Sequence, residues 1–104
     1  MDEMQATVVR AFKTVEQALG VLQGTPDCQS RTKALHGWRV AHTEELAQLT
    51  KEIKRYPLDQ LKPLILVEQK NHPGFDQAFE LVKKCERDAD FLAEWKVVWD
   101  LFGG

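Results

Sequence analysis

The chain has 104 residues, enough for one domain with a small hydrophobic core. Apolar residues make up 43% of it and charged residues 29%, a balance that excludes wholesale disorder and is ordinary for a globular protein. The net charge of −2 gives no strong field that would draw the chain to nucleic acid or to a membrane. We therefore expect residues 1–104 to form a single domain.

Apolar residues within 3–22 recur every three or four positions, so they fall on one face of a helix. This pattern predicts an amphipathic helix that ends before Gly24. Thr25 and Pro26 follow, and they are typical of the N-cap and the first position of a next helix. The residues of the apolar face are Met4, Val8, Ala11, Phe12, Val15, Ala18, Leu19 and Leu22.

A second apolar stripe keeps one phase through residues 27–55. Gly37 projects away from this stripe, so it costs roughly 1 kcal/mol relative to alanine without ending the helix. We predict one continuous helix over 27–55, ended by Pro57. The stripe consists of Leu35, Trp38, His42, Leu46, Leu49, Ile53 and Tyr56.

Two prolines divide residues 57–70, and Pro63 disfavours helical geometry at Lys62, the residue before it. No second segment of the chain could pair with a strand here, and an isolated strand would leave its backbone groups unpaired. We therefore predict two short helical pieces in this region.

From Phe75 onward the sequence is helical, but it carries two apolar stripes that point about 130° apart on a helical wheel. One straight helix cannot bury both stripes against one surface. We predict a break at 88–90, with Asp88 or Asp90 capping the last helix. The first stripe contains Phe75, Ala78, Phe79, Val82, Cys85 and Ala89, and the second contains Phe91, Leu92, Trp95, Val98, Trp99 and Phe102.

Short turns separate these amphipathic segments, which favours antiparallel neighbours. The sequence therefore predicts an all-α fold, a small antiparallel bundle of four to five helices. We expect its core to include Phe12, Val15, Leu35, Leu49, Ile53, Phe79 and Val82.

The last predicted helix is apolar on two sides, because Val97 and Leu101 lie opposite the stripe of Trp95 and Trp99. Such a helix is either central in its fold or docked on a partner, and tryptophan is a frequent anchor in interfaces. We expect the tryptophan side to pack on the bundle and Val97 and Leu101 to lie near the surface. The candidate partner-binding residues of this segment are Trp95, Val97, Trp99, Leu101 and Phe102.

Lys33, His36 and Arg39 form a basic face on the side opposite the second stripe, and residues 28–43 contain no acidic residue. We assign these three as candidate partner-binding residues, with an acidic protein surface as the expected partner. Nucleic acid is a less favoured partner because arginine is sparse. A face that is merely solvated is the alternative.

Signatures of catalysis are missing: the chain has no glycine-rich phosphate loop, no Cys-x-x-Cys and no His-Glu-x-x-His. His42 lies in an apolar stripe with no carboxylate on that stripe to orient it, which favours a packing role over proton transfer. A metal site would need distant residues such as Cys28, His42 and His72 to converge, so we expect neither metal nor cofactor.

Export and membrane insertion are not predicted. The acidic start at Asp2 and Glu3 lacks the basic region and apolar block of a secretory signal, and the longest apolar run, 64–67, is far too short to cross a bilayer. Without a signal, Cys28 and Cys85 are expected to be free thiols in a reducing compartment. We expect a soluble, cytoplasmic protein.

These observations together predict a non-catalytic interaction module that binds another protein, or a second copy of itself, and occludes or bridges it as an adaptor or inhibitor does. Two alternatives stay open. One is a small metal-binding or enzymatic protein that uses His42 with Cys28 or His72. The other is a weak nucleic-acid binder that uses the basic face.

Overall fold

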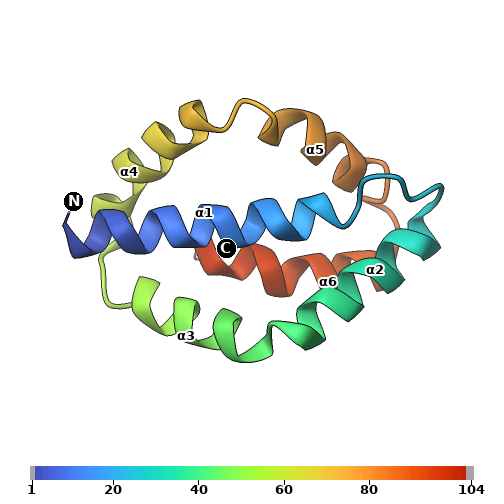
Figure 1. The fold of residues 1–104 in the computed structure, drawn as a ribbon, viewed down its shortest axis with the longest axis horizontal. Helices are drawn as coiled ribbons and strands as arrows, with labels where there is room; N and C mark the ends of the chain where they lie inside the picture. Colours follow the sequence, from blue (N-terminus) through green and yellow to red (C-terminus); the bar gives the residue numbers. More distant parts are fainter. Residues whose placement is uncertain (1, 103–104) are drawn as a thin grey trace.

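The computed structural model describes residues 2–102, and these residues form α-helices and one short 3-10 turn (Figure 1). No strand occurs in this range, so the predicted all-α fold is confirmed. The helices number six, one more than the upper end of the prediction. They are α1 (Glu3–Gly20), α2 (Cys28–Ala41), α3 (Thr43–Ile53), α4 (Leu58–Asn71), α5 (Phe75–Lys83) and α6 (Ala89–Trp99), followed by the 3-10 turn η1 (Asp100–Phe102).

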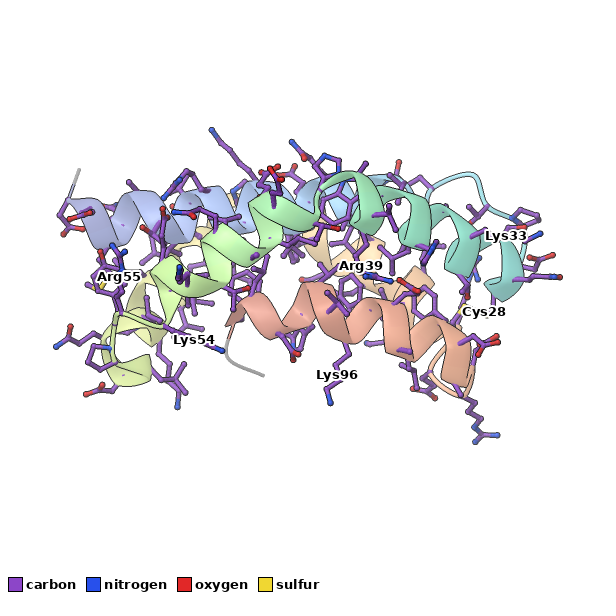
Figure 2. All side chains as sticks on the ribbon, turned by 90° about the horizontal axis from the view of Figure 1, so that it is seen from below. Cys28, Lys33, Arg39, Lys54, Arg55 and Lys96 are labelled. Atoms are coloured by element: carbon purple, nitrogen blue, oxygen red, sulfur yellow. A yellow bond between two sulfur atoms is a disulfide. The ribbon has the colours of Figure 1, made fainter. Side chains whose placement is uncertain are left out.

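The longest helix, α1, crosses the middle of the molecule and packs against each of the other five α-helices. In Figure 1, α2 and α3 run back along one side of α1, and α4 and α5 run along the other side. Helix α6 then returns and ends near the centre. Seen from the side of α2 and α3, α6 lies next to α2, and the η1 turn that follows α6 packs on α3 (Figure 2).

Helix α1 can take the central place because it buries a broad face. Two polar residues of that face, Thr7 and Thr14, are buried without penalty because their hydroxyls donate to the carbonyl oxygens of Glu3 and Arg10, at 3.0 and 2.9 Å. Asp2 caps the helix by accepting a hydrogen bond from the Gln5 amide at 2.7 Å. The apolar residues predicted for this helix supply the rest of the core.

The predicted core residues lie where the stripes place them. Phe12, Val15, Leu35, Leu49, Ile53 and Val82 are all buried, and Phe79 is partly buried.

The predicted continuous helix over 27–55 is wrong, because the chain breaks at His42 between α2 and α3. The His42 Nδ1–H donates to the Trp38 carbonyl oxygen at 2.7 Å, and the Thr43 hydroxyl contacts the carbonyl oxygens of Arg39 and Val40. Side-chain donors thus satisfy carbonyls at the end of α2, and the backbone of His42 leaves helical geometry, with φ −116° and ψ 20°.

Two other boundaries differ from the prediction. Helix α2 is capped by Asp27, which accepts from the Ser30 amide at 2.8 Å, and not by Thr25. Helix α4 continues through Pro63 as a single helix. Pro63 and Asp59 are both exposed, so water can take the Asp59 carbonyl that the proline leaves without a donor.

The break between α5 and α6 is as predicted. Asp88 accepts a hydrogen bond from the Phe91 amide at 3.0 Å and thereby begins α6. The first four residues of the first stripe consequently lie in α5, and the second stripe lies in α6 and η1, although Cys85 falls in the turn between the helices and Ala89 begins α6.

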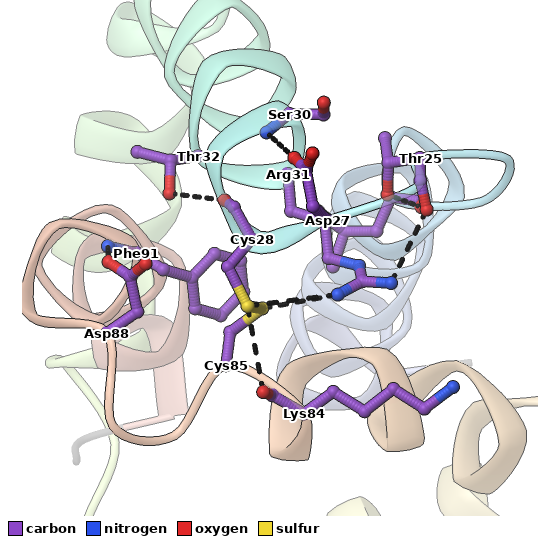
Figure 3. The surroundings of a disulfide bond; sticks show 11 residues. Thr25, Asp27, Cys28, Ser30, Arg31, Thr32, Lys84, Cys85, Asp88 and Phe91 are labelled. Atoms are coloured by element: carbon purple, nitrogen blue, oxygen red, sulfur yellow. Dashed lines mark hydrogen bonds between the residues drawn. A yellow bond between two sulfur atoms is a disulfide. The ribbon is translucent and has the colours of Figure 1, made fainter.

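Cys28 and Cys85 form a disulfide that joins the start of α2 to the turn after α5, with their Cα atoms 5.6 Å apart (Figure 3). The prediction of free thiols is therefore wrong. The two cysteines are 57 positions apart, and only the packing of the helices brings them together. The inference of a reducing compartment, which used free thiols as its premise, loses that support.

Within residues 2–102, none of the helices combines the length and the apolar character that crossing a bilayer would require.

Candidate partner-binding groove

The predicted basic face is only partly exposed, because α6 packs against it. Lys33 is exposed as expected. Arg39, however, donates from Nε to Glu94 Oε2 at 2.5 Å, and His36 Nδ1 lies 2.8 Å from Glu94 Oε1. The expectation that these residues face solvent is thus wrong for Arg39, whose side chain is 27% exposed, whereas His36 remains exposed beside its contact with Glu94. We call the contact of these two residues with Glu94 the α2–α6 seam.

Glu94 is the centre of this seam, and its side chain is only 15% exposed. The hydrogen bond from Arg39 holds the pKa of the Glu94 carboxyl below its ordinary value of 4.5, with a smaller contribution from His36 and against the effect of burial. The same hydrogen bond raises the pKa of Arg39. The seam is therefore closed by an ionised, hydrogen-bonded pair at neutral pH.

Beyond the break at His42 the arrangement changes, because α3 packs on η1 and not along α6. An open groove of about 690 Å³ lies between α3 and α6. We call it the α3–α6 groove. It is lined by Arg39, Thr43, Glu44, Leu46, Ala47, Gln48, Thr50, Lys51, Lys54 and Val97.

The α3–α6 groove is apolar in its middle and basic at one end. Leu46, Ala47 and Val97 provide the apolar surface, and Val97 is 41% exposed. Lys51 and Lys54 are exposed and form no ion pair among residues 2–102. Figure 2 shows Arg39 between α2 and α6 and Lys54 near the far end of α3. The groove thus joins one residue of the predicted basic face to one residue of the predicted C-terminal site.

The other C-terminal residues are divided between the core and the surface. Trp95 is buried, as expected, but Trp99 is 39% exposed and stacks on Trp95 with ring centroids 5.9 Å apart. Leu101, expected near the surface, is fully buried. The reason is that η1 tightens the last turn, which rotates Leu101 away from the Val97 side and into the contact with α3.

Trp99 and Phe102 line a second cavity, of about 280 Å³, where α4 faces the end of α6. Sequence reasoning missed the contribution of α4, although Leu58 and Ile65 lie seven positions apart and therefore on one face of that helix. The remaining lining residues are Phe12, Lys62, Gln69, Phe75 and Phe79. This aromatic pocket is smaller and more enclosed than the groove.

The histidines have structural contacts. His42 is half-buried and stacks on Trp38 at 4.5 Å between ring centroids, in addition to its hydrogen bond with the Trp38 carbonyl. His72 lies between two carboxylates, 3.1 Å from Glu16 and 3.4 Å from Glu68. Among residues 2–102 no three His, Cys, Asp or Glu side chains are grouped as a metal site requires. Cys28, one of the predicted alternative ligands, is held in the disulfide.

Known proteins offer no assignment for this arrangement. No protein-family model matches the chain, and no curated protein or solved structure is detectably similar to it. A function for the chain has to follow from its own surface.

Proposed function

We propose that this protein is a non-catalytic interaction module that binds another protein through the α3–α6 groove. The observation that supports the proposal is Val97, an apolar side chain exposed in a groove beside two lysines that form no ion pair in the described part of the chain. Single exposed apolar residues are common on protein surfaces. Val97 differs from them because Leu46 and Ala47 extend its apolar surface along the groove.

The occupant that fits this groove is an amphipathic helix with acidic flanks. A groove between two helices takes the apolar face of a third helix, which would cover Val97 and Ala47. Lys51 lies in the last turn of α3 and Lys54, three positions on, is the C-cap residue of that helix, so the two share one side and could meet carboxylates of the partner. Arg39 contributes little charge, because Glu94 neutralises it. Glu44 lines the groove as well and disfavours a partner that is acidic along its whole length.

The mechanism of such a module is steric. A helix of the partner that is held in the groove is no longer available to other proteins, which is how an inhibitor or an adaptor acts. The alternative of weak nucleic-acid binding has less support, because Glu94 already engages two of the three residues of the predicted basic face. The alternative of a metal site that uses Cys28 has less support because that sulfur is bonded to Cys85.

We also propose that the protein resides in the cytoplasm. The redox state of Cys28 and Cys85 in the producing cells tests this location. Rapid acid quenching of the producing cells, followed by alkylation, gives the oxidised fraction of Cys28 and Cys85. A substantial reduced fraction would support the cytoplasm. Complete oxidation would contradict it.

Photo-crosslinking from the groove tests the proposed function. A photoreactive amino acid replaces Val97 in one variant and Val67, a residue of the same type that is 52% exposed on α4, in a matched control. We expect a crosslink in the producing cells that is specific to position 97. Mass spectrometry should place it in an amphipathic helical segment of another protein, with net negative charge.

Three results would contradict the proposal: equal crosslinking from positions 97 and 67, crosslinks to nucleic acid, or partner segments that are basic or not amphipathic. A crosslink to another copy of this chain would show that the partner is a second copy of the protein and not a different protein.

A further inference from the structure

Arg31 is a buried cation that forms no ion pair with an acidic side chain within residues 2–102. The residue is only 6% exposed, and the stretch 28–43 in which it lies contains no acidic residue. Its guanidinium contacts the Thr25 carbonyl oxygen at 3.4 Å and Cys85 Sγ at 3.3 Å, and its buried Nε has no hydrogen-bond partner (Figure 3). Asp27 is the nearby acid, but its carboxylate is exposed and accepts from the Ser30 amide.

A buried charge is costly unless an opposite charge or good hydrogen bonds compensate it. The sulfurs of a disulfide are uncharged and accept hydrogen bonds only weakly. In the oxidised protein Arg31 is therefore poorly compensated. A thiolate at Cys85 would supply the missing negative charge 3.3 Å from the guanidinium.

The two sulfurs of the disulfide have different surroundings. Cys85 is 1% exposed and is the sulfur nearer to Arg31, whereas Cys28 is half-buried in the first turn of α2 and lies 3.9 Å from the same guanidinium nitrogen. The Lys84 carbonyl oxygen lies 3.6 Å from Cys28 Sγ. It becomes a hydrogen-bond acceptor only when Cys28 is a thiol with a proton to donate. Both sulfurs thus have better partners in the reduced state.

We propose that Cys28–Cys85 is a thiol–disulfide exchange site for a small thiol of the glutathione class. The thiolate of the small molecule attacks Cys28 Sγ, the more accessible sulfur, and forms a mixed disulfide with it. The bond to Cys85 breaks, and the electron pair leaves on Cys85 as a thiolate next to Arg31. A second small thiolate attacks the mixed disulfide, which releases the oxidised small disulfide and Cys28 as a thiolate that takes up a proton.

The physical consequence is a disulfide that is easier to reduce than a structural one. Stabilising the reduced form of a cysteine pair makes its disulfide a stronger oxidant, and a nearby cation stabilises the thiolate. Reduction would also untie the start of α2 from the turn after α5. Helix α2 would remain packed on α6, so the fold does not depend on the bond alone.

Equilibration in glutathione redox buffers tests the role of Arg31. Arg31→Met removes the cation while keeping an unbranched apolar side chain, and we expect its thiol–disulfide equilibrium with glutathione to shift toward the disulfide by about tenfold or more. Arg31→Lys should lie between this variant and the wild type. The matched control is Arg39→Met, whose guanidinium contacts Glu94, and it should shift the equilibrium less than about twofold. Equal shifts in Arg31→Met and Arg39→Met would overturn the proposal.

A second measurement needs no substitution at Arg31 and remains decisive if that variant fails to fold. The wild-type protein is exposed briefly to glutathione and acid-quenched, and peptide mass spectrometry locates the adduct. We expect glutathione on Cys28 with Cys85 free. Adducts that occur mainly on Cys85, or equally on both cysteines, would show that Arg31 does not select the leaving sulfur, and the proposal would be wrong.

Discussion

Helix α6 meets the two halves of the α2–α3 arm in different ways. Against α2 the contact is closed, because Glu94 joins Arg39 and His36 across the seam. Against α3 the contact is open, and Val97 remains exposed in the α3–α6 groove. The difference arises at His42, where the arm changes direction. The candidate binding surface therefore lies where a helix is interrupted, and not where the basic residues are densest in the sequence.

Truncating a buried side chain of α6 should have the largest effect on stability, because the contacts with α2 and with α3 both depend on the position of that helix. Trp95→Ala should lower the free energy of unfolding by about 3–5 kcal/mol, since Trp95 is only 7% exposed. Trp99→Ala should cost clearly less, because its ring is 39% exposed. Chemical denaturation measures both. Equal losses would show that the two tryptophans are equivalent and that α6 has no distinct core side.

Breaking the α2–α6 seam should lower the free energy of unfolding by an intermediate amount. Glu94→Gln should lower the free energy of unfolding by about 1–3 kcal/mol, because it weakens a charge-assisted hydrogen bond to Arg39 at a site with little solvent. The control is Glu80→Gln, which removes an exposed contact with Lys83 and should change stability by less than about 0.5 kcal/mol. The seam would not be a stabilising contact if both variants unfolded at the same denaturant concentration.

The seam also predicts a pH dependence. The pKa of Glu94 is lower in the folded protein than its ordinary value of 4.5, chiefly because of Arg39. Its contribution to stability is therefore complete well above that value and is lost as the pH falls through the lower folded-state pKa. The difference in unfolding free energy between the wild type and Glu94→Gln should shrink as the pH falls below 4.5. A difference that stays constant or grows on acidification would assign the effect to packing.

The open groove should contribute least to folding. Val97→Asp should change stability by less than about 0.5 kcal/mol, because Val97 is already 41% exposed. Leu101→Asp, on the neighbouring turn, should instead unfold the protein, since it places a charge in the core. Thermal unfolding distinguishes the two outcomes. A large loss in Val97→Asp would mean that the groove is part of the core.

Hydrophobic periodicity was sufficient to predict the all-α class, the core stripes and the Asp88 break, because burial of one face is a property of local spacing. The same method could not detect the break at His42. One residue that leaves helical geometry hardly changes the phase of the stripe, and Leu35, Leu46 and Leu49 are buried on both sides of the break.

Contacts between distant segments could not be predicted from a single sequence. The disulfide and the Glu94 pairing join residues 57 and 55 positions apart, and no local pattern reports such distances. The burial of Arg31 could not be predicted for the same reason, since it depends on the contact with Cys85 in the turn that follows α5. The position opposite the tryptophans correctly predicted that Val97 is exposed, but the same reasoning placed Leu101 near the surface, and Leu101 is buried.

The affinity of the segment captured at position 97, made as a synthetic peptide, tests the central claim most directly. Its dissociation constant is measured for the wild type, for Val97→Asp and for the matched control Val67→Asp. We predict a loss of about thirtyfold or more in Val97→Asp, which corresponds to the cost of removing an interface anchor, and a change within about twofold in Val67→Asp. Equal affinities for the three proteins would contradict the assignment of the α3–α6 groove as the binding site.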